Sequence, residues 1–217
     1  MTSPRERILG KVRTSLGRGE LDGTTRERLA RRVAEPPEYL QARYQGEGLQ
    51  HFLDKLASPG LSASVERLGG LGDLRAAVQG YLEKHQLAPR VCITSDPRLN
   101  NLNWAGIEVH HDIDRNEPVS ISVAESGIME TGTLVFQSGP DSPTLHHFLA
   151  LHHLAVLEVD NLVPYMEDYW RRFRERGEAH PRNINFVTGS SGTADIEAQL
   201  VRGAHGPRFL HIFLMGE

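Results

Sequence analysis

The chain has 217 residues, of which 39% are hydrophobic and 24% are charged, and its net charge is −4 with the histidines neutral. This length and composition predict a globular protein with one substantial core. The weak negative charge argues against general nucleic-acid binding, which requires a concentrated basic surface. No apolar run approaches the length of a membrane span and the N-terminus has no apolar signal region, so we expect a cytoplasmic protein.

The first 55 residues are predicted to form a helical N-terminal arm, residues 1–55. Ser3 and Glu6 are spaced as a capping box around Pro4, and apolar residues follow at helical spacing as far as position 16. A second, basic helix is expected over residues 24–33, before a pair of prolines. The arm has few large apolar residues, so either it packs on another subunit, which could be a second copy of the chain, or it is partly mobile.

The remaining residues, 56–217, are predicted to form one α/β domain. Strands are expected at 61–68, 90–94, 107–110, 119–123, 132–137, 154–159, 185–188 and 209–215. Helices are expected at 73–85, 144–151, 163–176 and 193–202. Short apolar strands that alternate with helices are typical of βαβ units and of a mostly parallel sheet.

Cys92 is the only cysteine of the chain and lies in the apolar run 91–93. No internal disulfide can form, and we expect no iron–sulfur cluster, cysteine-based zinc site or other cofactor on this chain alone. Cys92 is predicted to be a small buried hydrophobic residue, as free cysteines usually are.

A loop rich in glycine and hydroxyl groups follows the predicted strand 185–188 and leads into the predicted helix 193–202. Glycines allow tight turns, and the first amides of a helix attract a phosphate or carboxylate, so the loop is a candidate anion site. Its candidate ligand-binding residues are Gly189, Ser190, Ser191, Gly192, Thr193 and Asp195. The alternative is a well-capped helix with no ligand, in which Asp195 complements the helix dipole and would repel an anion.

A second candidate segment, residues 125–133, lies between two predicted strands. Glu130 could act as an acid or base if partly buried, because burial raises the pKa of a carboxyl group. Thr131, Gly132 and Thr133 are its candidate ligand-binding neighbours. The alternative is a turn whose glutamates face water.

Histidines provide a third candidate. His205 lies in a short linker of small residues between Gly203 and Pro207, where it could act as an acid or base or contact an anion, or could be a plain linker residue. Six of the eleven histidines form adjacent pairs, at 110–111, 146–147 and 152–153. Adjacent side chains point apart on a strand or helix, so these pairs are poor chelates and we expect no purpose-built metal site.

Two motifs give the chain a resemblance to a known family. Residues 123–135 resemble the signature of the LUD domain of the lactate-utilisation protein C (YkgG-type) family. Residues 193–197, followed by Gly203, His205, Gly206, Pro207 and an apolar strand, resemble the C-terminal signature of the same family. The match covers essentially the whole chain and is strongest over residues 118–215.

The resemblance implies a three-layer α/β sandwich similar to glucosamine-6-phosphate deaminase, ribose-5-phosphate isomerase and CoA transferases. It also implies a bacterial L-lactate utilisation system, in which iron–sulfur partner proteins help to oxidise L-lactate to pyruvate and hold the clusters. Family members usually have a basic residue where this chain has Gly192, which weakens the predicted anion site.

The leading hypothesis is therefore a component of a lactate-oxidising system whose small-anion pocket contains Glu130 and His205 as acid/base groups. One alternative is a non-catalytic assembly subunit whose N-terminal helices bind the iron–sulfur proteins. Another is a stand-alone enzyme that acts on a phosphorylated or CoA-linked small molecule. Whether the chain is an enzyme is left open by the sequence.

Overall fold

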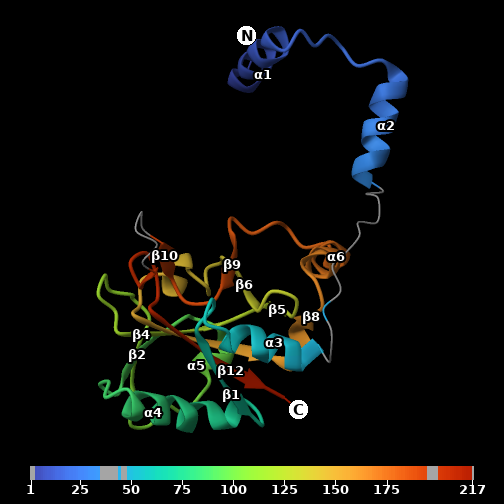
Figure 1. Cartoon of the computed structure of the whole chain (residues 1–217). Helices are drawn as coiled ribbons and strands as arrows, with labels where there is room; N and C mark the ends of the chain where they lie inside the picture. Colours follow the sequence, from blue (N-terminus) through green and yellow to red (C-terminus); the bar gives the residue numbers. More distant parts are fainter. Residues whose placement is uncertain (1–2, 35–43, 45–47, 195–199, 217) are drawn as a thin grey trace. The chain divides into compact units, whose positions relative to one another are not determined.

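The computed structural model describes residues 3–34, 44, 48–194 and 200–216 (Figure 1). The chain divides into two compact units, residues 1–43 and 44–217. The sequence analysis placed the boundary at residue 55. The helix α3, Gly48–Ala57, belongs to the second unit because it buries Phe52 and Leu56 in the core of that unit.

The first unit contains the two predicted N-terminal helices, α1 at Pro4–Ser15 and α2 at Gly23–Ala34. The capping box of α1 is confirmed. The Ser3 hydroxyl accepts a hydrogen bond from the Glu6 amide at 3.2 Å, and the Glu6 carboxylate accepts one from the Ser3 amide at 2.7 Å. Neither helix buries any residue. Local capping therefore defines where these helices begin, and packing adds little to them.

The second unit is built on a six-stranded sheet in the order β1-β12-β7-β4-β2-β3. Every neighbouring pair in this main sheet is parallel. The predicted α/β class with a mostly parallel sheet is confirmed. The strands are β1 Ala63–Leu68, β2 Arg90–Ile93, β3 Glu108–His110, β4 Val119–Val123, β7 His152–Glu158 and β12 Phe209–Met215.

A second, four-stranded sheet has the order β8-β5-β6-β9 and is largely antiparallel. Its strands are β5 Ser126–Ile128, β6 Thr133–Gln137, β8 Leu162–Val163 and β9 Ile184–Thr188. A separate two-stranded hairpin pairs β10, Gly192–Ala194, with β11, Leu200–Arg202.

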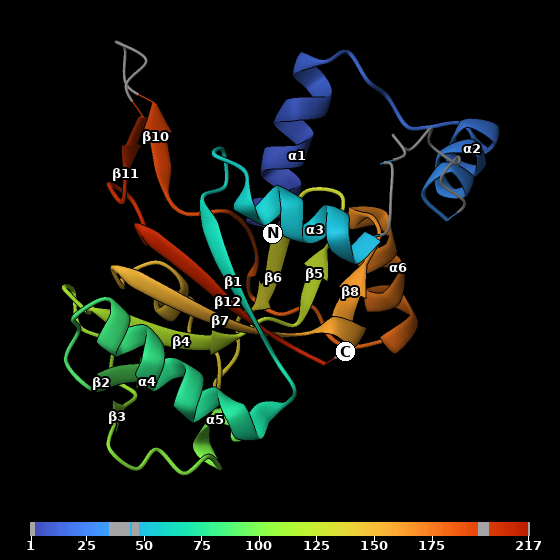
Figure 2. The same cartoon turned by 60° about the horizontal axis from the view of Figure 1, so that its bottom comes forward.

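The remaining helices are α4 Leu74–Lys84, α5 Pro97–Asn100 and α6 Met166–Arg176, with 3-10 turns at Leu71–Asp73, Thr144–His147 and Val159–Asn161. Figure 2 shows α4 lying along one side of the main sheet. The helix α6 packs on the second sheet, where Tyr169 joins a small core with Ile128 and Val135.

The two faces of the main sheet are covered differently. The helix face packs against α4 and α5, and its core contains Val78, Leu82, Leu99, Val91, Ile93, Val119, Ile121, Leu154, Val156 and Phe213. The second-sheet face packs against α3 and the second sheet, and its core contains Phe52, Leu134, Phe136, Ala155, Leu157, Leu210 and Ile212. Because successive residues of a strand point to opposite faces, β7 and β12 contribute to both cores.

Two predicted helices are wrong. The described residues of the segment 193–202 form strands instead of a helix, because Thr193 pairs with Val201 in the β10–β11 hairpin. Both residues are β-branched and fit a strand pair better than a helix. The segment 144–151 forms only a short 3-10 turn, Thr144–His147. Within the described residues, no helix is long and apolar enough to cross a membrane.

Candidate functional site

A pocket of about 280 Å³ lies where the loop after β9 meets the loop before β12. We call it the C-terminal pocket. It is lined by His147, Phe148, His153, Phe186, Val187, Gly189, Ser191, Gly192, Thr193, His205, Gly206, Pro207 and Leu210. The structure thus brings His205 together with Gly189, Ser191, Gly192 and Thr193, as the sequence analysis expected. Asp195 lies outside the described residues.

Backbone hydrogen bonds hold the Gly189–Thr193 loop in place. The Ser190 amide donates to the Leu61 carbonyl at 2.9 Å, and the Ser191 amide donates to the Pro207 carbonyl at 2.8 Å. These two amides are therefore already used within the protein. Because a strand rather than a helix follows, the predicted anion site at a helix N-terminus is not formed.

Arg202, at the end of β11, holds the same loop in place. Its guanidinium donates to the Ser190 hydroxyl at 2.9 Å and to the carbonyls of Pro59 and Gly60 at 2.6 and 3.2 Å. Ser190 is buried and does not line the pocket. The sequence analysis missed this contact, because Arg202 lies far along the chain from Pro59 and no motif connects them.

The close approach of Leu61 explains why glycine is required at positions 132 and 189. Gly132 and Gly189 have left-handed φ values of +68° and +81°. A Cβ atom at Gly132 would lie 2.7 Å from Leu61 Cδ2, and one at Gly189 would lie 2.5 Å from Leu61 Cα. Any side chain would clash at both positions, so only glycine lets the two loops approach this residue.

Two buried imidazoles, His147 and His153, line the C-terminal pocket. The Nε2 atom of His153 lies 2.6 Å from the Ser122 hydroxyl, and the ring of His147 stacks on Phe136 at 4.4 Å. Burial lowers the pKa of His147 to about 4 and that of His153 well below its usual value. Both rings are therefore neutral near pH 7, and each can offer one N–H donor or one lone pair.

The Nδ1 atoms of these two histidines are buried and have no hydrogen-bond partner among the described residues. A buried polar atom without a partner costs free energy, so native proteins usually satisfy it with water or a ligand. Both atoms thus belong to residues that line the C-terminal pocket.

The predicted site around Glu130 lies at the turn between β5 and β6, outside this pocket. None of Glu130, Thr131, Gly132 or Thr133 lines the pocket. The Glu130 amide donates to the Pro164 carbonyl at 3.1 Å, and His51 Nε2 lies 3.2 Å from the Glu130 carbonyl. The Glu130 turn is therefore held against α3 and the residue after β8.

A chain of hydroxyl groups connects this turn to the loop of the pocket. The Thr131 and Thr133 hydroxyls lie 2.7 Å apart, and the Thr133 hydroxyl lies 2.7 Å from that of Thr188. Thr188 directly precedes Gly189. The two motifs are thus neighbours in space, although they do not share one cavity. The acid/base role of Glu130 stays a prediction.

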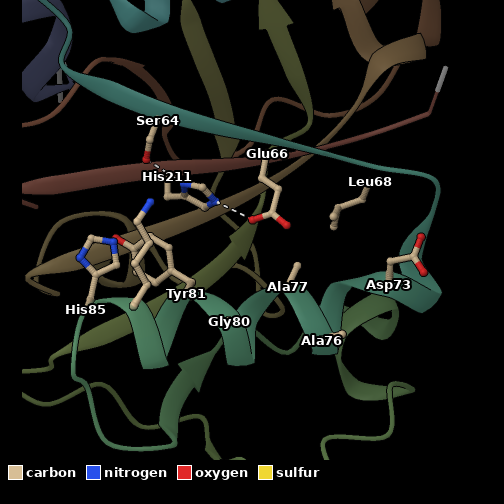
Figure 3. A pocket seen from close by; sticks show the side chains of 11 residues that line it. Ser64, Glu66, Leu68, Asp73, Ala76, Ala77, Gly80, Tyr81, His85 and His211 are labelled. Atoms are coloured by element: carbon tan, nitrogen blue, oxygen red, sulfur yellow. Dashed lines mark hydrogen bonds and ion pairs between the residues drawn. The ribbon is translucent and has the colours of Figure 1, made fainter.

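A second hollow, of about 430 Å³, lies between α4 and the β1–β12 edge of the main sheet. Figure 3 shows the His211 ring between Ser64 and Glu66. His211 Nδ1 lies 2.7 Å from the Ser64 hydroxyl, and Nε2 lies 3.8 Å from a Glu66 carboxylate oxygen. Burial lowers the pKa of His211 to about 4.

The sequence analysis did not identify this group of side chains. Ser64 and His211 are partners in the parallel register of β1 and β12, so their side chains share one face. They are 147 positions apart in the chain. The pairing of distant strands, rather than any local spacing, brings them together.

The fold and the comparisons with known proteins agree. A crystal structure of a DUF162 family protein from Deinococcus radiodurans shares the fold, with a TM-score of 0.56 at 18% identity, covering 81% of this chain and 100% of that one. The LUD domain family matches residues 82–215. The chain belongs to the LUD domain family, and the resemblance seen in its motifs is confirmed.

Two relatives are also similar in sequence to the chain. Lactate utilization protein C of Halalkalibacterium halodurans is 27% identical over an alignment of 228 positions, and the alignment covers 95% of each chain. Lactate utilization protein C of Geobacillus sp. (strain WCH70) is 35% identical over 158 residues, which cover 62% of this chain and 65% of the relative.

Proposed function

We propose that the chain is a component of an L-lactate utilisation system and that the C-terminal pocket binds a small carboxylate such as L-lactate or pyruvate. Relatives of nearly the same length are named for lactate utilisation. The observation that supports the pocket most strongly is the pair of unpartnered Nδ1 atoms on its two buried histidines, His147 and His153.

The lining of the pocket suits a small ligand with both polar and apolar parts. Carboxylate oxygens would accept hydrogen bonds from an imidazole N–H and from the hydroxyls of Ser191 and Thr193, with His205 at the exposed side. None of the described residues in the lining has a permanent charge. Hydrogen bonding rather than an ion pair would therefore have to offset the cost of desolvating the carboxylate.

Oxidation of L-lactate to pyruvate removes two electrons and two protons, and in this proposal the electrons leave through partner proteins. Cys92 is the only cysteine, and a cysteine-held iron–sulfur cluster requires several. The iron–sulfur clusters would therefore lie on the partner subunits, and this chain would bind the substrate or product.

A thermal-shift experiment on the full-length protein tests the pocket. A ligand at 100 times its dissociation constant stabilises a protein by about 2.7 kcal/mol. We expect L-lactate or pyruvate to raise the unfolding temperature by several degrees, and we expect His205→Gln and Thr193→Val to reduce that shift. Glu130→Gln is the matched control, because Glu130 does not line the pocket.

Two outcomes would overturn this assignment. One is the absence of any shift with either acid. The other is a shift that survives both pocket variants and disappears in Glu130→Gln, which would move the site to the β5–β6 turn. Phosphate, sugar phosphates and CoA in the same screen test the alternative of an enzyme acting on phosphorylated or CoA-linked molecules.

The assembly-subunit alternative is supported by a different observation, on the first unit. Four apolar side chains of this unit are exposed at helical spacing, namely Ile8, Leu9, Val12 and Leu16. Such a stripe is typical of a helix that binds a partner. Under this alternative, Val12→Glu would abolish co-purification of the chain with the iron–sulfur proteins. L-Lactate and pyruvate would then leave the unfolding temperature unchanged.

A further inference from the structure

Three side chains that commonly bind metals converge near the β3 edge of the main sheet. The Cys92 sulfur, a ring nitrogen of His110 and a carboxylate oxygen of Glu117 all lie within 4.8 Å of one another. Cys92 and His110 are register partners in the parallel pair β2–β3, so they share one face. Glu117 lies two residues before the start of β4. None of these residues lines the C-terminal pocket.

The hydrogen bonding of His110 determines which ring nitrogen is free. Its Nδ1 atom lies 3.1 Å from the carbonyl oxygen of Asp112. A carbonyl can only accept a hydrogen bond, so Nδ1 has the proton and the Nε2 atom of the neutral ring has a lone pair. A second-shell bond of this kind is what orients a metal-binding histidine in known metalloproteins.

The free Nε2 atom faces another electron-pair donor. It lies 3.4 Å from Oε1 of Glu117, whose side chain is 1% exposed. Both atoms are buried, and neither has a hydrogen-bond partner among the described residues. Two buried lone-pair donors in contact repel one another unless a proton or a cation lies between them.

The separation of these atoms favours a cation. A charge-assisted N–H···O bond between a histidine and a carboxylate spans about 2.7–2.9 Å, which is shorter than the separation observed. Two ligands that each lie about 2.1 Å from one ion at a tetrahedral angle are about 3.4 Å apart. A thiolate, a carboxylate and a neutral imidazole would also balance the two positive charges of a divalent ion.

We propose that Cys92, His110 and Glu117 bind a divalent metal ion of the zinc class. Sulfur, nitrogen and oxygen together suit Zn²⁺ better than Mg²⁺ or Ca²⁺, which prefer oxygen ligands alone. Three protein ligands leave a fourth position open for water or a small anion, as in catalytic rather than structural zinc sites.

The surroundings of the site fit this assignment. Glu117 also lines a wide hollow of about 690 Å³ together with Arg90, Asp114 and Arg115. On the inner side, the Nε2 atom of His146 lies 3.5 Å from the Cys92 sulfur and donates to the His111 carbonyl at 2.9 Å. The turn Thr144–His147 thus places His146 at the metal site and His147 in the C-terminal pocket.

Cobalt titration of the full-length, chelator-stripped protein tests the site. We expect one equivalent of Co²⁺ to produce a thiolate-to-cobalt charge-transfer band and the intense visible bands of four-coordinate cobalt, and Zn²⁺ to displace it. Cys92→Ser should abolish the charge-transfer band. His110→Gln and Glu117→Gln should weaken Co²⁺ binding at least about tenfold.

His180→Gln is the matched control, because it removes an exposed histidine elsewhere in the same unit and should leave the spectrum unchanged. The unfolding temperature of each variant without metal shows whether it is folded, and Cys92→Ala provides a second test if the serine variant is not. A wild-type protein without a charge-transfer band, or a band that survives in the folded cysteine variants, would overturn the proposal and leave His110 and Glu117 as a buried ion pair. The cobalt spectrum is measured without any organic acid, so this result is independent of the lactate experiment.

Discussion

The two faces of the main sheet differ in the side chains that they bury. On the helix face, Val91, Ile93, Val119 and Ile121 pack against α4 and α5 in an apolar core. On the second-sheet face, the register aligns His110, Cys92, Ser120 and His153 in one row across four neighbouring strands. These helix-face positions are apolar, whereas the row on the second-sheet face is made of histidine, cysteine and serine and includes residues of both proposed sites.

Polar residues can line the second-sheet face because they find hydrogen-bond partners in the covering layer and on the neighbouring strand β7. The Ser120 hydroxyl donates to the His146 carbonyl at 2.7 Å, and the Ser122 hydroxyl lies 2.6 Å from His153 Nε2. Buried polar groups are tolerated where they are hydrogen-bonded. The difference between the two faces thus depends on what covers each of them. The loss of unfolding free energy on substitution measures that difference.

The largest effect is expected on the helix face. Ile121 is fully buried in β4, and Ile121→Ala removes buried methyl groups and leaves a cavity. We expect the free energy of unfolding to fall by roughly 2–5 kcal/mol, measured by urea denaturation. A loss below about 1 kcal/mol, within the range of ordinary substitutions, would show that this core is not tightly packed.

The second largest effect is expected where the backbone of Gly189 approaches Leu61. Gly189→Ala places a Cβ atom 2.5 Å from Leu61 Cα at a φ of +81°. Strain and overlap together should cost about 2–3 kcal/mol of unfolding free energy. Gly139→Ala is the control, since a Cβ atom there meets nothing within 4 Å. Equal effects of the two substitutions would contradict the close approach.

Ser122→Ala measures the contribution of the polar face to stability. Ser122 is the neighbour of Ile121 in β4, so the two side chains point to opposite faces of the same strand. The substitution leaves the Nε2 atom of the buried His153 without its hydroxyl partner. We expect a loss of about 1–3 kcal/mol in the same urea measurement. A loss larger than that of Ile121→Ala would reverse the ranking of the two faces.

Buried histidines on both faces should make stability depend on pH. Burial lowers the pKa of His152 and His211 on the helix face, and of His147 beside the other face, to about 4. Between pH 6.5 and about 4 the unfolded chain binds protons at these rings that the folded chain does not, so stability falls as the pH falls. Each ring contributes at most about 1.4 kcal/mol per pH unit.

Urea unfolding at pH 7 and pH 5 checks this prediction. The His152 ring faces Tyr81, whose hydroxyl lies 2.9 Å from Nδ1, and His85, whose charge would lower the pKa of His152 further. His152→Gln should therefore reduce the difference in unfolding free energy between the two pH values. Stability that is higher at pH 5 than at pH 7 would contradict the assignment of neutral buried rings.

The smallest change in unfolding free energy is expected in the helix α2, which is not part of the sheet. Val33 in α2 is 80% exposed. Val33→Ala should change the free energy of unfolding by less than about 0.5 kcal/mol, because an exposed side chain has little packing to lose. A larger loss in the isolated monomer would indicate that α2 packs on other parts of the chain.

Local patterns in the sequence were sufficient to predict the strands of the main sheet, the helix α4 and the cap of α1. Each of these depends on residues within one turn or one strand, where periodicity and capping act. The two motifs around Glu130 and Gly189 were also visible, and their glycines are explained by the approach to Leu61. The predicted helix over residues 193–202 failed because strand pairing between Thr193 and Val201 is not a local property.

Tertiary structure alone decided which side chains meet. Cys92, His110 and Glu117 come from β2, from β3 and from the connection before β4, and no spacing between them is typical of metal ligands. Ser64 and His211 likewise meet only because β1 and β12 are neighbours. The sequence determined which segments become strands and which faces of them are apolar. The order and register of those strands depend on contacts between segments far apart in the chain, and the positions of the candidate sites follow from that register.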